Sequence, residues 1–275
     1  MIPAKFFRAV IVGLTLLISN QMSPTVWAKT SISTTESRWK LGNQVVKVRN
    51  QSSGRGLTFV NLHDNEETAV RATLKFLKTS PGELIQLRHS GNRRIKFTFR
   101  RQTYSFDPNS MFSPAGIKKS LRDHGAYSES AHEKIFLFVN HFLSYLQPLS
   151  NKKNLIAVHN NTDGLYSINS YIKGHYLAKE ASRVFLGQGR DPDNFFLVTK
   201  AAHYNYLKAK KYNVILQNNQ NATDDGSLSV FCGRNRFPYI NIEVQHGHNK
   251  TQLAMIQTVA QMLAYKKQTP NKRRR

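Results

Sequence analysis

The chain alternates between short apolar runs and longer stretches in which apolar residues recur at helical spacing. Short apolar runs bounded by polar residues are typical of buried strands, and Val70, Leu74 and Leu77 fall on one face of a helix. Because such stretches alternate, we predict an α/β fold with a mixed, mostly parallel sheet and helices on both faces. The predicted strands are residues 57–62, 83–87, 155–158, 195–199, 213–217 and 239–243, and the predicted helices are residues 67–77, 203–209 and 251–265.

Three further segments complete the predicted architecture. Residues 95–99 and 103–106 alternate with period two, which predicts a hairpin that delivers Asp107-Pro108-Asn109 to a loop. Ser113 followed by Pro114 predicts a helix start, with helical segments up to about residue 145. Residues 30–54 are polar and irregular, and only residues 44–48 suggest an edge strand.

The first 28 residues have the pattern of a secretory signal. Lys5 and Arg8 form a basic start, an apolar stretch follows, and Val26-Trp27-Ala28 is a small-residue cleavage site. The alternative is an uncleaved N-terminal anchor, although the apolar stretch is short for a membrane span. We therefore predict a secreted or periplasmic protein without a stable membrane span after cleavage.

The composition adds a strong positive charge and a single thiol. The formal net charge is +24, which steers the protein toward anionic polymers and surfaces. No zinc-finger or RNA-recognition signature accompanies this charge, so we expect no nucleic-acid partner. Cys232 is the only cysteine, which excludes an internal disulfide and favours a buried apolar role over a nucleophile.

The residues His63-Asp64-Asn65-Glu66 follow the predicted strand at residues 57–62. The tight turn after a strand brings positions i and i+3 together, so His63 and Glu66 can face one ion. His159 follows another predicted strand, and the carboxyl ends of parallel strands share one edge of a sheet. Two imidazoles and a carboxylate favour one zinc ion. The alternative is a plain turn in which Glu66 caps the next helix.

Glu243 ends the predicted strand at residues 239–243. A carboxylate that emerges from an apolar strand is costly to bury without a partner. An apolar surround would raise the pKa of Glu243 and suit it to act as a general base. The alternative is a structural salt bridge with one of the many basic residues.

These motifs, in this order along residues 57 to about 248, resemble the zinc carboxypeptidase family and its relatives, the succinylglutamate desuccinylases and aspartoacylases. The resemblance implies a zinc carboxypeptidase-like fold, with His63, Glu66 and His159 as zinc ligands and Glu243 as general base. It also implies that Asn109 binds substrate, although a turn residue is the alternative. Where the family usually has Asn-Arg, this chain has Asn109-Ser110.

Two other features bear on substrate binding. An arginine should stabilise an oxyanion or grip a carboxylate, and we select Arg93 from the four arginines at positions 93, 94, 100 and 101. Asp224-Asp225 forms an acidic patch that either selects basic groups of the substrate or is a solvated turn. His246 and His248 are interpreted as pocket or loop residues, because the zinc ligands are already complete.

The function predicted from the sequence is a zinc-dependent hydrolase that cleaves an amide bond, with carboxypeptidase-like activity on peptides such as those of the cell wall. One alternative is an acyl-amino-acid deacylase of the same family. A second is a non-catalytic metal-containing module that binds anionic polymers. We assign residues 1–28 to the signal peptide, 29–54 to an N-terminal polar segment, 55–268 to the zinc hydrolase domain and 269–275 to a basic tail.

Overall fold

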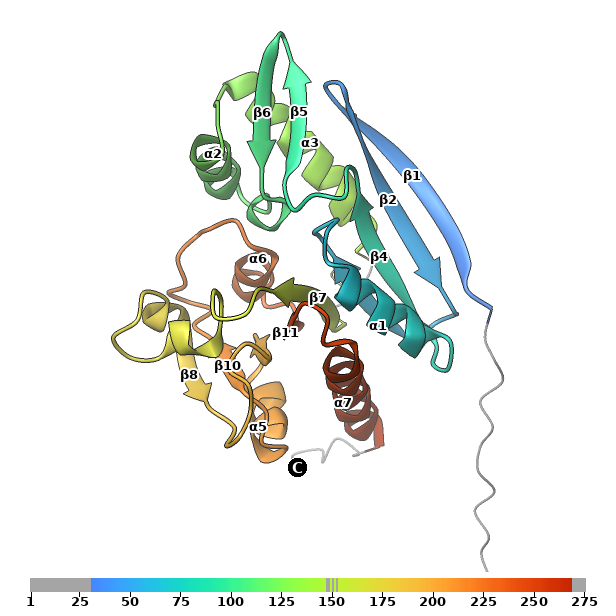
Figure 1. The fold of residues 1–275 in the computed structure, drawn as a ribbon, viewed down its shortest axis with the longest axis vertical. Coiled ribbons are helices and arrows are strands. Elements are labelled where there is room, and N and C mark those ends of the chain that lie inside the picture. The colour runs from blue at the N-terminus through green and yellow to red at the C-terminus, as the bar shows by residue number, and fades with distance from the viewer. Residues whose placement is uncertain (1–30, 147–148, 150, 152, 269–275) are drawn as a thin grey trace, which may run out of the picture.

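A nine-stranded sheet forms the centre of the protein, in the order β1-β2-β4-β3-β7-β11-β9-β10-β8. The structure is a computed structural model that describes residues 31–146, 149, 151 and 153–268 (Figure 1). The predicted signal peptide and basic tail lie outside these described residues. No helix in the described ranges has the length and apolar character needed to cross a membrane.

The four central strands run parallel to one another, and antiparallel pairs flank them on both sides. The central strands are β4 (Gly82–Arg88), β3 (Leu57–Asn61), β7 (Leu155–Asn161) and β11 (Tyr239–Gln245). The flanking strands are β1 (Ser33–Leu41), β2 (Gln44–Ser52), β9 (Phe195–Val198), β10 (Val214–Gln217) and β8 (Ala181–Phe185). Because β3, β7 and β11 are adjacent and parallel, their carboxyl ends meet at one edge, as predicted for the site.

Helices cover both faces of the sheet and bury two separate apolar cores. Leu207 and Ile256 belong to one core, whereas Ile117, Phe138 and Leu228 belong to the other. The first core contains α1 (Glu67–Leu77), α5 (Ala201–Ala209) and α7 (Asn249–Gln268), and the second contains α2 (Pro114–Asp123), α3 (Glu129–Leu143) and α6 (Leu228–Arg234). The predicted α/β class with helices on both faces is confirmed.

A separate two-stranded sheet carries the loop after residue 106. Strands β5 (Ile95–Phe99) and β6 (Gln102–Phe106) pair as the alternation predicts, and Figure 1 shows them beside α2 and α3. The chain then makes a short 3₁₀ helix, η1 (Pro108–Ser110), before Ser113 caps α2 with its side chain. The hairpin therefore delivers Asp107 and Asn109 to the carboxyl edge of the main sheet.

The segment at residues 30–54 was predicted to be mostly irregular, and that expectation was wrong. It forms the long hairpin β1–β2, and β2 pairs antiparallel with β4. Only one face of this hairpin packs on the core, where Leu41, Val46 and Val48 are buried. Most other residues of the hairpin are polar and exposed or half-buried, so the segment has a polar sequence although β1 pairs with β2 and β2 pairs with β4. The sequence also missed β8 and α6, which are short.

Candidate metal centre

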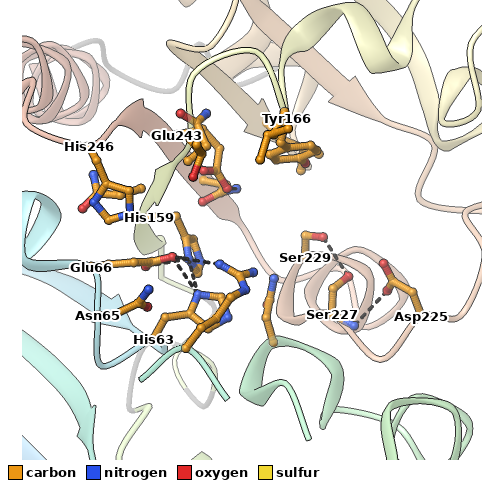
Figure 2. Close-up of a pocket in the computed structure, with 18 of the residues that line it drawn as sticks. His63, Asn65, Glu66, His159, Tyr166, Asp225, Ser227, Ser229, Glu243 and His246 are labelled. Carbon is orange, nitrogen blue, oxygen red and sulfur yellow. Dashed lines mark hydrogen bonds and ion pairs between the residues drawn. The ribbon is translucent and has the colours of Figure 1, made fainter. Parts of the chain in front are cut away.

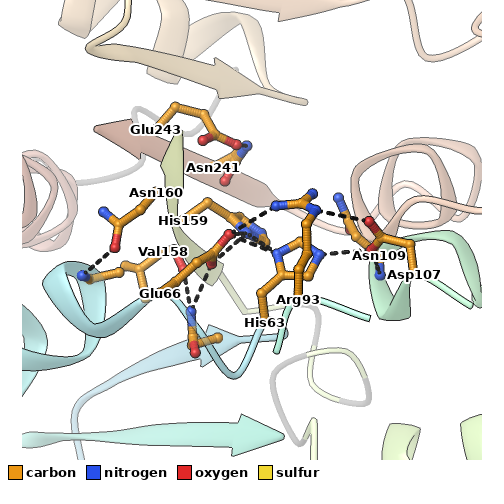
Figure 3. A network of polar contacts seen from close by, with 12 residues as sticks. His63, Glu66, Arg93, Asp107, Asn109, Val158, His159, Asn160, Asn241 and Glu243 are labelled. Atoms are coloured by element: carbon orange, nitrogen blue, oxygen red, sulfur yellow. Dashed lines mark hydrogen bonds and ion pairs between the residues drawn. The ribbon is translucent and has the colours of Figure 1, made fainter. Parts of the chain in front are cut away.

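His63, Glu66 and His159 converge at the carboxyl edge of β3 and β7, as Figure 3 shows. Nδ1 of His63 lies 2.7 Å from Oε1 of Glu66, and Nδ1 of His159 lies 3.1 Å from Oε2 of Glu66. The two Nδ1 atoms are 3.3 Å apart. All three side chains are at most 2% exposed. One nitrogen from each ring and one carboxylate thus face a common point.

The donors fit a metal ion in both chemistry and spacing. One ligand atom from each residue lies within 4.8 Å of the others. Tetrahedral zinc, with zinc–nitrogen bonds of about 2.05 Å, separates two nitrogen ligands by roughly 3.3 Å. The separation between the His63 and His159 nitrogens matches this value. The helix-capping alternative for Glu66 is not realised, because its side chain makes no capping hydrogen bond to α1.

Opposite charges attract the histidine and carboxylate side chains of this centre to one another. Burial alone would lower the pKa of His63, but the charges of Glu66 and Asp107 outweigh burial and raise it to about 9. Burial raises the pKa of Glu66, yet His63 and His159 hold it far below its usual range. A buried carboxylate that stays ionised beside two imidazoles is the electrostatic arrangement a cation requires.

A second layer of side chains orients the three donors. Oδ1 of Asp107 lies 2.7 Å from Nε2 of His63, which directs the opposite nitrogen toward Glu66. Asn61 donates to Oε2 of Glu66 at 3.0 Å and to the carbonyl of Val158. The sequence named Asp107 only as part of the Asp-Pro-Asn motif, and the structure shows its contact with His63.

Arg93 bridges the two carboxylates around His63. Its Nε donates to Asp107 at 3.1 Å and its Nη1 to Glu66 at 3.4 Å, while about half of its side chain stays exposed. The loop that carries it wraps around Asp64. Oδ2 of Asp64 accepts three successive backbone N–H groups, from His89, Ser90 and Gly91, at 2.7 to 2.8 Å.

Glu243 lies beside the centre on β11, where it is the strand partner of His159. Burial raises the pKa of its carboxyl, although the nearby His159 opposes the shift. Asn241 donates to Oε1 of Glu243 at 3.0 Å. Among the described residues Glu243 forms no salt bridge, which argues against the structural alternative.

These residues line one end of a cavity of about 450 Å³ (Figure 2). Asn109 lines it as well, and its side-chain oxygen accepts the backbone N–H of Leu228 at 3.4 Å. Of the four arginines considered, Arg93 alone lines the cavity. The wall that continues away from the metal centre includes Tyr166, Tyr171, Leu197, Asp225, Ser227, Ser229, Tyr239 and Asn241.

The remaining candidates from the sequence separate into pocket and non-pocket residues. His246 lines the cavity, whereas His248 lines a shallow depression formed by residues 247–251. Cys232 is buried, and burial raises the pKa of its thiol, which favours the apolar role. The sequence reading missed Asn241, although its position two residues before Glu243 places both side chains on one face of the strand. It also missed the pair Tyr166–Tyr171, which comes from an irregular segment.

No protein-family model matches this chain, and no curated protein matches it. Among solved structures it is similar to a candidate metallopeptidase from Shewanella baltica OS155, at 12% identity and a TM-score of 0.41, over 84% of this chain and 86% of that one. It is also similar to one from Shewanella denitrificans OS217, at 10% identity and a TM-score of 0.39, over 84% of each chain. A likeness this distant establishes neither a family nor an activity for this chain.

Proposed function

We propose that this protein is a zinc-dependent hydrolase that cleaves an amide bond. His63, Glu66 and His159 hold the metal, and Glu243 acts as general base. One observation carries the proposal: three groups that can ligate a metal meet within 4.8 Å at the end of a cavity, and its wall holds a buried carboxylate for which the described residues supply no salt-bridge partner.

Each chain residue has a definite task in such a reaction. A zinc ion at this place would supply Lewis acidity for the substrate carbonyl and for the attacking water. Glu243, whose pKa is raised by burial, takes a proton from that water and delivers it to the leaving amine nitrogen. Asn241 keeps the Glu243 carboxylate oriented through its hydrogen bond.

Arg93 is suited to stabilise negative charge that develops on the substrate oxygen. Its Nε and Nη1 contact Asp107 and Glu66, which fixes the plane of the guanidinium at the mouth of the metal centre. Because the side chain is half exposed and lines the cavity, the remaining N–H groups can reach a bound substrate.

The scissile amide bond belongs to a peptide or to an acyl amino acid, and substrates of both classes carry a free carboxylate. A clamp for a free carboxylate needs a planar pair of donors, and Ser110 stands where the resembled family has an arginine. Arg93 is the one arginine among the cavity-lining residues, and it is already engaged by two carboxylates. We retain carboxypeptidase-like cleavage of peptides, including cell-wall peptides, as the first candidate, with deacylation as the second.

Secretion or export to the periplasm is part of the proposal and rests on the pattern of residues 1–28. It is tested by the N-terminal sequence of the protein recovered after export. A new terminus immediately after Ala28 would support the proposal, whereas an intact N-terminus would favour the anchor.

The activity is tested by incubating zinc-loaded protein with a panel of free-ended peptides and acyl amino acids. We expect release of amino acids by the wild type, and a loss of about 10²- to 10⁴-fold in Glu243→Gln, the range for removal of a general base. His248→Gln, outside the cavity, is the matched control and should keep full activity. Bound zinc without turnover of any panel member would instead favour the non-catalytic module.

A further inference from the structure

Carboxylates line the cavity although the chain as a whole is strongly basic. The protein carries a formal net charge of +24, yet three carboxylates line the cavity: Glu66, Glu243 and Asp225. The one lining arginine, Arg93, is paired with Glu66 and with Asp107. Glu66 and Glu243 belong to the metal centre, whereas Asp225 lies away from it (Figure 2).

Asp225 stays without a cationic partner. Its Oδ1 accepts the backbone N–H of Ser227 at 2.8 Å, and no lysine or arginine in the described ranges forms an ion pair with it. Its neighbour Asp224 behaves differently, since it accepts from Ser113 at 2.6 Å and pairs with Arg234 at 2.9 Å. Asp224 is thus satisfied within the fold, whereas Asp225 is exposed and lines the cavity without an ion-pair partner among the described residues.

The loop that carries Asp225 is fixed in place. Gly226 adopts a φ of +74°, and a side chain there would lie 2.4 Å from the carbonyl oxygen of Ser110. The same added carbon at Gly226 would also clash with Gly116. Ser227 and Ser229 extend the polar wall, with their hydroxyl oxygens 3.1 Å apart. The carboxylate is therefore held at the cavity by a backbone that has little room to move.

A second polar group in the same wall also lacks a partner. Asn241 is 8% exposed, and its Oδ1 has no hydrogen-bond partner although the residue lines the cavity. Its Nδ2 donates to the Glu243 carboxylate, which fixes the amide orientation and leaves the oxygen as an acceptor. Buried acceptors without partners are costly, so a donor on a ligand is expected to meet this one.

The cavity has the length to link its two ends. Tyr239, Asn241 and Glu243 occupy one face of β11, and the four residue-to-residue steps from 239 to 243 span about 13 Å. Tyr171 lines the same cavity, and burial, together with the charges of Glu243 and Asp225, raises the pKa of its hydroxyl. An extended side chain bound at the metal centre would project its tip toward Asp225.

We propose that the Asp225 end of the cavity is a subsite for a positively charged group of the substrate, an ammonium or guanidinium at the tip of an extended side chain. Asp225 is its counter-ion, and the serine hydroxyls and Asn241 are additional acceptors. This inference rests on the proposed function, because it names the substrate class of the same site.

Equilibrium binding tests the subsite without requiring turnover. Zinc-loaded Glu243→Gln protein is titrated by calorimetry with N-acetyl-alanyl-lysine and with N-acetyl-alanyl-norleucine. The norleucine side chain has the four carbons of lysine and lacks only the terminal ammonium. We expect about tenfold tighter binding of the lysine peptide, as for one partly exposed charge pair. Adding Asp225→Asn should abolish this preference. Asp224→Asn removes the same charge from the same loop outside this cavity and should keep it.

Equal affinity for both peptides, including no binding of either, would overturn the subsite. A lysine preference that survives Asp225→Asn would overturn it as well. Failure of the hydrolase proposal is a separate result: the wild type would then release no product from the lysine peptide, while the preference and its dependence on Asp225 remained.

Discussion

Nε2 of His63 lies 2.7 Å from Oδ1 of Asp107, a residue 44 positions later in the chain. This contact fixes which ring nitrogen faces the candidate metal centre, because Nδ1 is then directed at Glu66 and His159. In the sequence the hairpin β5–β6 lies between these two residues, and its end places Asp107 against His63. The centre thus depends on a segment outside the main sheet.

Asp107→Asn should weaken zinc binding by about 10- to 100-fold, the usual effect of removing a carboxylate behind a histidine ligand. The amide keeps the shape of the side chain but not its charge. Competition with a chromogenic chelator measures the affinity, and Asp123→Asn on the surface of α2 is the control with the same change in net charge. Unchanged affinity in Asp107→Asn would show that the His63–Asp107 contact does not support the metal.

The metal-free protein should lose stability as the pH rises through about 9. His63 has a pKa of about 9 in the folded state, above the unfolded value near 6.5, so folding favours its protonated form. Its contribution is complete below about pH 6.5 and is lost above about pH 9, on the order of 3 kcal/mol for the whole His63–Glu66–Asp107 group. Chelator-treated protein is melted across this range, and His63→Gln should remove the trend.

The stability that zinc adds should depend on pH in the opposite sense. A metal ligand must be neutral, so binding displaces the proton of His63 and becomes stronger as the pH rises toward 9. The stabilisation that zinc adds in a thermal melt should therefore grow with pH over this interval. A zinc effect independent of pH would contradict His63 as a ligand.

Arg93→Ala should lower kcat/KM by about 10²- to 10³-fold, mainly through kcat, because its donors act on charge that develops during reaction. Arg93→Lys should recover little of the loss, since an ammonium lacks the planar fork that spans Glu66 and Asp107. Arg101→Ala is the control, because Arg101 lies at the hairpin turn and outside the cavity. Equal losses in both alanine variants would assign the effect to charge rather than to position.

Gly226→Ala should destabilise the fold by more than about 2 kcal/mol, because it combines a left-handed backbone with a contact that cannot form. The added carbon would lie 2.4 Å from the Ser110 carbonyl oxygen. Gly164 has a similar φ of +70° with open space around it, so Gly164→Ala should cost only about 1 kcal/mol. Similar denaturant midpoints for the two variants would contradict the close packing of the Asp225 loop.

The sequence predicted the part of the site that depends on strand ends. His63 and His159 each follow an apolar run, and parallel neighbouring strands bring such positions to one edge without further information. The helix at residues 67–77 was predicted with its observed bounds, because its apolar positions repeat at helical spacing. Glu243 follows the same rule on β11.

The remainder depends on contacts between distant segments. Asp107 meets His63 only because a two-stranded sheet folds over the edge of the main one, and nothing in the local pattern near Asp107 encodes that packing. Asp225 and Asp224 are indistinguishable as a sequence pair, yet Arg234 from the next helix pairs with Asp224 alone. Of the β1–β2 hairpin only the strand at residues 44–48 was predicted, and the rest was missed because few of its residues are buried.

The zinc content of the purified protein is the most direct test of the proposed metal centre. Purified protein, reconstituted with zinc and freed of excess metal, is measured by elemental analysis beside His63→Ala, His159→Ala and Glu243→Gln. We expect about one zinc per chain in the wild type and in Glu243→Gln, and loss of the zinc in both histidine variants. A wild type that holds no zinc after reconstitution, or histidine variants that keep it, would contradict the metal centre and the hydrolase built on it.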